Sequence, residues 1–260
     1  MLRLSANLGF LWAQLPLLER IERAAASNFR AIELHWPYDT PAQAVKSACR
    51  RLDLTLLAAN APIGDAGLGE SGLAALAGRE AEFKKSFEMS LAWCVEAGAT
   101  AIHVLPGIVP SEQHATARRT LVQNLQWAAD LARQHGVTIL LEAINQRDKP
   151  GYFYSTQAES NAIRELCERD NIKLMFDVYH VGVAEGDIFT KLALYMPHIG
   201  HIQIAAVPSR AEPDEGEVAY RAVFERIEAL GYQGWIGCEY KPRSTVEEGL
   251  RWRDTVQPSP

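Results

Sequence analysis

The feature that most constrains the fold of this chain is a repeated alternation between short aliphatic runs and longer amphipathic stretches. Runs such as LTLLAA, AIHVL and VTILLE are almost continuously apolar, which is typical of strands buried on both faces of a parallel sheet. The pattern predicts strands at Leu4–Leu8, Ala31–Leu34, Leu54–Ala59, Ala101–Leu105, Thr138–Glu142, Lys173–Asp177, Ile199–Gln203 and Trp235–Glu239. It predicts helices between them, among others at Leu17–Ala26, Arg79–Ala97, Thr116–Gln134 and Tyr220–Leu230.

Eight strand–helix units in 260 residues predict an α/β fold, a (β/α)8 TIM barrel, with residues 1–260 as one domain. No Pro/Ser-rich linker divides the chain, and Gly98, Gly136 and Gly231 are expected helix ends. The last unit is the least regular, because the tail after Glu239 is short. The alternative fold, a doubly wound open sheet, predicts a glycine-rich phosphate turn after an early strand, and the sequence has none.

Charge and composition exclude several classes of partner. The formal net charge is −6, so no global basic field is present to hold nucleic acid or an anionic membrane. No apolar run approaches the ~20 residues that span a bilayer, and no secretory cleavage site is visible. The widely spaced Cys49, Cys94, Cys167 and Cys238 are expected to be buried, reduced thiols. We therefore expect a cytoplasmic protein, with homo-oligomerisation left open.

Polar residues end the last four predicted strands: Glu142, Asp177, Gln203 and Glu239. In a barrel the carboxyl ends of the strands converge on one face, so these side chains are expected to share one site. Three carboxylates buried together need compensation, which a divalent cation provides. Because the donors are all oxygens, Mg²⁺ or Mn²⁺ is favoured over structural zinc. The alternative is that each acid caps a helix or forms a surface ion pair.

Other polar residues fall near the same predicted face. His180 and Arg210, in the loops after strands six and seven, are expected at the site. The alternative for Arg210 is that it only orders its own loop, by pairing with Glu212, Asp214, Glu215 or Glu217. Lys241 is left between a substrate contact and a partner for a neighbouring acid. His103 lies inside a strand and is expected to be a core histidine. Glu33 is left between a place at this face and a hydrogen bond to a Lys or Arg from another strand end.

Two long loops follow strands three and five, at 60–78 and 145–156. Loops of this length in a barrel are commonly covers for an active site, and the glycines of the first would let it move over a small ligand. Phosphate binding by the first loop is the weaker alternative, because it lacks a GKS or GKT ending.

Four segments carry a family resemblance: ILLEAINQRDKPGYF, LMFDVYHVGVAEGDI, IGHIQIAAVPSRAEPDEGEVAY and GYQGWIGCEYKP. Together they resemble the hydroxypyruvate isomerase family, among the xylose-isomerase-like barrels. The resemblance implies a divalent metal, Mg²⁺ or Mn²⁺, at Glu142, Asp177, Gln203 and Glu239. It implies that Glu142 and Glu239 transfer protons. It further implies that His180 and Arg210 contact substrate.

The loop after Gln203 departs from the family pattern Q-I-A-D-x-P-G-R-H-E-P-G-T-G-E. The departures are Ala206, Ser209, Ala211 and the pair Asp214–Glu215. This loop borders the expected pocket, so the departures bear on substrate choice rather than on the metal. The acidic run 212–217 and the ending EYKPRSTVEEGLRW look more like the 2-oxo-tetronate isomerase branch.

The expected reaction is isomerisation of a small 2-oxo-3-hydroxy acid, of the hydroxypyruvate to tartronate semialdehyde type, through an enediolate. Arg210, His180 or Lys241 would hold the anionic sugar acid, with Arg suited to a bidentate grip. The alternatives are a 2-oxo-tetronate isomerase, a ketose 3-epimerase acting on a neutral sugar, an abasic-site nuclease, and a non-catalytic metal-binding protein. The nuclease would need more His ligands and a basic face, whereas the chain has seven His and a net charge of −6.

Overall fold

The strands close into one parallel barrel in the order β1 to β8, with β8 pairing back to β1. The computed structural model describes residues 3–256. The strands are β1 (Arg3–Asn7), β2 (Ala31–Leu34), β3 (Thr55–Asn60), β4 (Ala101–His103), β5 (Thr138–Glu142), β6 (Ile172–Asp177), β7 (Ile199–Ile204) and β8 (Trp235–Cys238). The predicted (β/α)8 barrel is therefore confirmed, and the doubly wound sheet is excluded.

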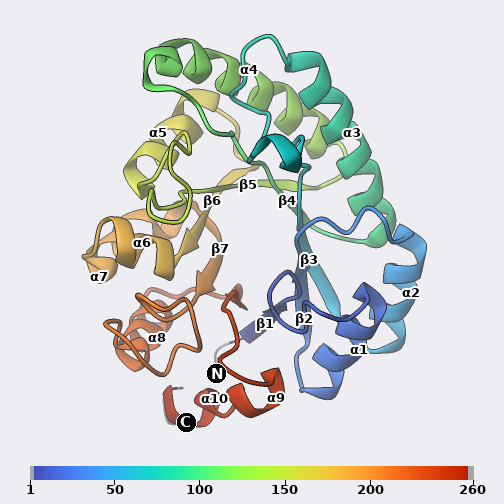
Figure 1. Cartoon of the computed structure of the whole chain (residues 1–260), viewed down its shortest axis with the longest axis vertical. Coiled ribbons are helices and arrows are strands. Elements are labelled where there is room, and N and C mark those ends of the chain that lie inside the picture. The colour runs from blue at the N-terminus through green and yellow to red at the C-terminus, as the bar shows by residue number, and fades with distance from the viewer. Residues whose placement is uncertain (1–2, 257–260) are drawn as a thin grey trace.

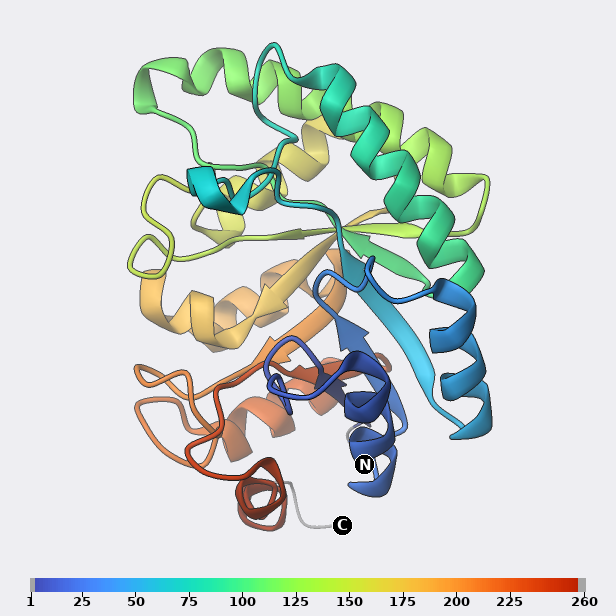
Figure 2. The same cartoon turned by 45° about the vertical axis from the view of Figure 1, so that its right-hand side comes forward.

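Helices surround the barrel on its outside (Figure 1), and the turned view shows the long α3 and α4 lying along one flank (Figure 2). They are α1 (Leu17–Ala26), α2 (Ala42–Arg51), α3 (Glu80–Ala97), α4 (His114–Arg133), α5 (Gln157–Cys167), α6 (Val178–Ala184), α7 (Ile188–Tyr195), α8 (Tyr220–Ala229), α9 (Val246–Gly249) and α10 (Trp252–Val256). Short 3-10 turns are η1 (Ala66–Leu68), η2 (Ser111–Gln113) and η3 (Met196–His198). No helix within residues 3–256 has the length and apolarity to cross a membrane.

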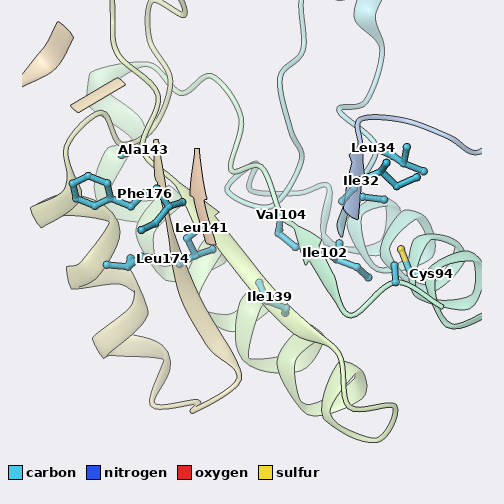
Figure 3. Close-up of a cluster of buried hydrophobic side chains, with 14 of the residues drawn as sticks. Ile32, Leu34, Cys94, Ile102, Val104, Ile139, Leu141, Ala143, Leu174 and Phe176 are labelled. Atoms are coloured by element: carbon cyan, nitrogen blue, oxygen red, sulfur yellow. The ribbon is translucent and has the colours of Figure 1, made fainter. Parts of the chain in front are cut away.

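Alternation along each strand sorts side chains between the helices and the barrel interior. On β5, Ile139 and Leu141 belong to the large core cluster between sheet and helices, seen in Figure 3. The alternate residue Leu140 belongs instead to a small separate cluster with Ala58, Ala101 and Met175. Glu142 has the parity of Leu140, so the strand that builds the core also aims this acid into the barrel.

The predicted boundaries agree with the structure to within two residues, and the differences have local causes. Strand β4 ends at His103 rather than Leu105, because the carbonyl of Leu105 turns to the loop 60–78 and accepts from the Ala74 N–H at 3.4 Å. The expected helix-end glycines have positive φ, +88° at Gly98 and +75° at Gly231. The irregular last unit carries α9 and α10, two short helices, in place of one long helix.

Candidate functional site

Side chains at or near the carboxyl ends of β5 to β8 converge in one mouth of the barrel. Glu142, Asp177, His180 and Glu239 each offer one ligand atom, and these atoms lie within 4.8 Å of one another. Gln203 joins them, since its Nε2 is 3.4 Å from Glu239 Oε1. All five side chains belong to buried residues. The structure therefore brings together the four residues predicted as ligands, and their roles remain predictions.

Three oxygens in this cluster are buried without a hydrogen-bond partner in the described part of the chain: Glu142 Oε1, Asp177 Oδ2 and Gln203 Oε1. An unpaired buried acceptor costs about 1–3 kcal/mol, so three together indicate a missing partner. A divalent cation would satisfy all three, and an oxygen donor set suits Mg²⁺ or Mn²⁺. The residues present fit the metal that the sequence implies.

Asp177 combines a helix cap with an inward-facing oxygen. It ends β6, and its Oδ1 accepts from the Tyr179 N–H at 2.8 Å, which caps the start of α6. The capping alternative is therefore correct for one oxygen of this acid, and Oδ2 is left for the site. Burial, followed by the negative charge of Glu239, raises the pKa of Asp177 to about 7.

Glu239 is the most strongly held of the acids. Its Oε1 accepts from Asn7 Nδ2 at 2.9 Å and lies 3.1 Å from His35 Nε2, and its Oε2 accepts from Arg210 Nη2 at 2.7 Å. Burial opposes ionisation, but the hydrogen bond from His35 and the charge of Arg210 outweigh it and lower the pKa of Glu239 to about 2. Glu142 differs: burial and the charges of Glu239 and Asp177 raise its pKa. A cation near Glu142 would offset this repulsion.

His180 presents a hydrogen-bond donor to the cluster. Its Nδ1 accepts from the backbone N–H of Asn145 at 3.3 Å and lies 2.6 Å from Asn145 Nδ2. The proton of the neutral ring is therefore on Nε2, which faces Glu142 Oε1 at 3.6 Å and Asp177 Oδ2 at 3.7 Å. Burial, followed by the charge of Arg210, lowers the pKa of His180 to about 3. A neutral donor fits the predicted substrate contact better than a metal ligand.

Arg210 reaches into the mouth from the loop after β7. The guanidinium lies 4.8 Å from the ring centre of Phe10 and 4.9 Å from that of Tyr179, and Nη2 is 4.0 Å from Asp177 Oδ2. The backbone has φ +57°, which helps the loop turn the side chain inward. Burial opposes its charge, but the carboxylates of Glu239 and Asp177 outweigh this and raise the pKa of Arg210.

A different arginine, Arg243, makes the ion pairs that the loop-ordering alternative assigned to Arg210. Arg243 pairs with Glu212, Asp214 and Glu215 at 2.9, 2.6 and 2.6 Å. Glu212 is fully buried and also accepts from the Arg243 backbone N–H. The acidic run thus ties the loop after β7 to the segment after β8 through Arg243. Arg210 instead faces the site, where its Nη1 lies 3.4 Å from Asp148 Oδ2.

A cavity of about 470 Å³ opens over the cluster. Both long loops line it, the first through Ile63 and Ser71 and the second through Lys149 and Tyr152. The expectation that these loops cover the site agrees with this placement. Lys241 also lines the cavity, and its backbone N–H donates to the Arg210 carbonyl at 2.7 Å.

Sequence reasoning misplaced or missed several residues here. His103, expected in the core, is buried but lines the cavity, with Nδ1 3.6 Å from Glu142 Oε2. Within residues 3–256 Glu33 bonds neither Lys nor Arg, and its Oε2 is 2.9 Å from His201 Nε2, so the Lys or Arg alternative is wrong. Asn7 ends β1 in the structure, but the predicted strand continued to Leu8, so the rule of polar strand ends did not find it. No local signal singles out Lys149 or Tyr152.

A closed (β/α)8 barrel with an oxygen-rich cluster at the carboxyl ends of its strands defines a class of barrel enzymes. Residues 21–256 match the family described as "Xylose isomerase-like TIM barrel", and the chain belongs to this family. It is 44% identical to a 2-oxo-tetronate isomerase of Cupriavidus necator over 96% of each chain. It is 38% identical to the hydroxypyruvate isomerase of Escherichia coli, over 98% of this chain and 99% of that one. These relatives confirm the predicted family and the prediction of an isomerase.

A solved structure extends the similarity to the whole backbone. The crystal structure titled "AP endonuclease, family 2" from Brucella melitensis matches with a TM-score of 0.96 and 36% identity, over 99% of this chain and all of that one. Its title names a nuclease activity, whereas the two relatives above are named as isomerases. The choice between these two activities for this chain therefore depends on the residues of its own site.

Proposed function

We propose that this chain is a divalent-metal-dependent isomerase of small 2-oxo-3-hydroxy acids. The observation that carries the proposal is the set of three buried, unpartnered oxygens on Glu142, Asp177 and Gln203 beside the cationic Arg210. The oxygens fit a hard cation, and the arginine fits an anionic substrate. The metal would be held by these three residues together with Glu239.

The two glutamates are assigned the proton transfers. One carboxylate removes the proton from C3 of the substrate, and a proton is returned to C2 while the hydroxyl proton passes from O3 to O2, so the product is an isomer. Glu142 comes from β5 and Glu239 follows β8, on different sides of the mouth. A bound divalent cation supplies stabilisation of the negative charge that develops on the substrate oxygens. His180 Nε2 donates a hydrogen bond to a substrate oxygen.

The cations of the cavity support an acid rather than a neutral sugar. Arg210, Lys149 and Lys241 all line it, although the chain as a whole carries a net charge of −6. A local cationic group can bind a carboxylate against that global field. The loop after β7 and the 44% identity to a 2-oxo-tetronate isomerase favour the four-carbon acid over hydroxypyruvate.

The nuclease alternative is weaker on the same observations. Such an enzyme neutralises several phosphates with basic residues, and the composition is acidic. Within residues 3–256, a single group of His and acidic side chains has the geometry of a metal site. It contains one histidine, not the several that additional metals would need.

An NMR exchange assay in D₂O tests the function. Purified protein with Mn²⁺ or Mg²⁺ is incubated with 2-oxo-tetronates, hydroxypyruvate and neutral ketoses, and carbon-bound deuterium and product are followed. We expect isomerisation of the acids, which stops on chelation of the metal. Exchange on ketoses alone, with inversion at one carbon, would replace the proposal by a 3-epimerase. Cleavage of abasic DNA without turnover of any of these substrates would replace it by a nuclease.

A further inference from the structure

Gln203 differs from the other candidate ligands because the two ends of its side chain are not equivalent. A carboxylate can rotate and still present an oxygen, whereas an amide presents an acceptor in one orientation and a donor in the other. A donor facing the cation would remove the ligand. Something must therefore decide which way the amide of Gln203 points.

Two carboxylates accept from Gln203 Nε2, Glu239 at 3.4 Å and Glu33 at 3.0 Å, and the nearer one, Glu33, is placed to decide it. Its side chain comes from β2, is 3% exposed, and its Oε2 accepts from Gln203 Nε2 at 3.0 Å. A carboxylate offers acceptors, so it attracts the amide nitrogen and turns the amide oxygen away. Gln203 Oε1 is the atom left buried and unpartnered in the described chain. The orientation that Glu33 selects is thus the one that a metal ligand needs.

The barrel interior is shaped to hold Glu33 in this position. A Cβ at Gly237 would lie 1.9 Å from Glu33 Oε1, so this position on β8 has room for the carboxylate only as glycine. The Ser5 hydroxyl donates to the same oxygen at 3.4 Å, and His201 Nε2 lies 2.9 Å from Oε2. Three strands other than β2 therefore fix a carboxylate that is not itself one of the candidate ligands.

We propose that Glu33 is a positioning residue, which holds the amide of Gln203 with its oxygen toward the metal. The inference rests on the proposed metal-dependent function. It makes Glu33, His201 and Gly237 a support for the ligand set, and it explains why a carboxylate is buried away from the cavity. Partners of this kind behind a metal ligand commonly change metal affinity by about 10–100-fold.

Two simpler roles for Glu33 make different predictions. If it only adds negative charge near the cation, then any neutral replacement should weaken binding equally. If it only stabilises the barrel through His201, then its loss should lower the melting temperature without changing metal affinity. Orientation alone predicts that a neutral acceptor at position 33 will preserve the site.

The test measures Mn²⁺ affinity by calorimetry in the full-length chain, with melting temperatures of the metal-free proteins alongside. We expect Glu33→Met to weaken Mn²⁺ binding about 10–100-fold. Glu33→Gln should stay within about threefold of wild type, because its amide oxygen can still accept from Gln203 Nε2. Adding Gln203→Glu to Glu33→Met should recover binding, since a carboxylate needs no orientation.

Gly237→Ala provides a second variant if Glu33→Met does not fold. It retains all the acidic side chains and displaces Glu33 by contact, so weaker Mn²⁺ binding is again expected. Wild-type affinity in a folded Glu33→Met or Gly237→Ala variant would overturn the inference. So would an equal loss in Glu33→Gln and Glu33→Met. Failure of the wild-type chain to bind Mn²⁺ would overturn the proposed function as well, which separates the two failures.

Discussion

The two halves of the barrel interior differ in the polarity of one layer of side chains. These side chains stand two residues before the polar residue at the carboxyl end of each strand. In the half formed by β3 to β6 these residues are apolar, and in the half formed by β7, β8, β1 and β2 they are polar or glycine. The apolar set is Ala58, Ala101, Leu140 and Met175, and the other set is Ser5, Glu33, His201 and Gly237. Glu142 and Asp177 follow the apolar half, whereas Gln203 and Glu239 follow the polar half.

The difference shows what each kind of ligand needs from its surroundings. Glu142 and Asp177 present an oxygen whichever way they rotate, so hydrophobic packing behind them suffices. Gln203 needs an acceptor for its nitrogen, which Glu33 supplies at 3.0 Å. The polar half thus supplies the acceptor that the amide of Gln203 needs.

The largest expected effect does not depend on the difference between the halves, because one catalytic glutamate lies in each. Glu142→Gln and Glu239→Gln should each lower turnover by about 10²–10⁴-fold, since each removes a proton-transferring group. Steady-state kinetics on the preferred sugar acid measures the loss, with the exposed Glu225→Gln on α8 as a matched control. Activity within tenfold of wild type in both variants would dismiss the two-glutamate mechanism.

Removal of a ligand from the apolar half comes next. Asp177→Ala should abolish tight Mn²⁺ binding and with it the metal-dependent rise in melting temperature. At a metal concentration 100 times the dissociation constant, that stabilisation is about 2.7 kcal/mol. Calorimetry and thermal denaturation with and without Mn²⁺ measure both effects, and Asp170→Ala, at an exposed surface pair, serves as control. Unchanged affinity would show that the ligand set is wrong.

Arg210 spans the two halves, through Asp177 on one side and Glu239 on the other. Arg210→Met should lower kcat/KM for sugar acids by a factor that corresponds to about 1.5–3 kcal/mol of lost transition-state stabilisation, the scale of a charged hydrogen bond. It should affect kcat/KM for neutral ketoses far less. Arg243→Met loosens the same loop from outside the cavity. It should therefore lower kcat/KM for sugar acids and for neutral ketoses equally. Equal losses in Arg210→Met would indicate loop ordering and favour the epimerase.

The smallest expected effect tests whether the difference between the two halves is limited to the barrel interior. The four cysteines report on the layers outside it. Burial raises the pKa of Cys49 to about 11 and that of Cys94, Cys167 and Cys238 to about 12, so little thiolate exists at pH 8. None should react rapidly with a thiol reagent in the native protein, and all four should react after unfolding. Rapid labelling of one cysteine would reveal a difference between the halves in the outer layers too.

Local sequence carried most of the fold and the positions of the candidate ligands. Apolar runs with the period of a strand placed all eight strands, and Glu142, Asp177 and Gln203 follow from where those runs stop. Asn7 ends β1 as well, but the apolar run continues to Leu8, so the same rule did not find it. These signals are readable because they depend on residues adjacent in the chain.

Partner choice was not readable in the same way. The sequence suggested Lys or Arg for Glu33, but the structure pairs it with His201 and Gln203, about 170 residues away. It also left Arg210 between substrate and the acidic run, and the structure assigns that run to Arg243. Arg210 and Arg243 are equal in charge, so only geometry distinguishes them.

The sequence by itself determined the barrel, the alternation that turns polar strand ends inward, and the oxygen donors of the mouth. Only the tertiary structure decided which oxygens stay unpartnered, which arginine faces the cavity, and that Glu33 fills the space beside Gly237. The physical reason is that hydrophobic periodicity acts between near neighbours, whereas a hydrogen bond in the interior forms only after closure of the barrel brings β2, β7 and β8 together.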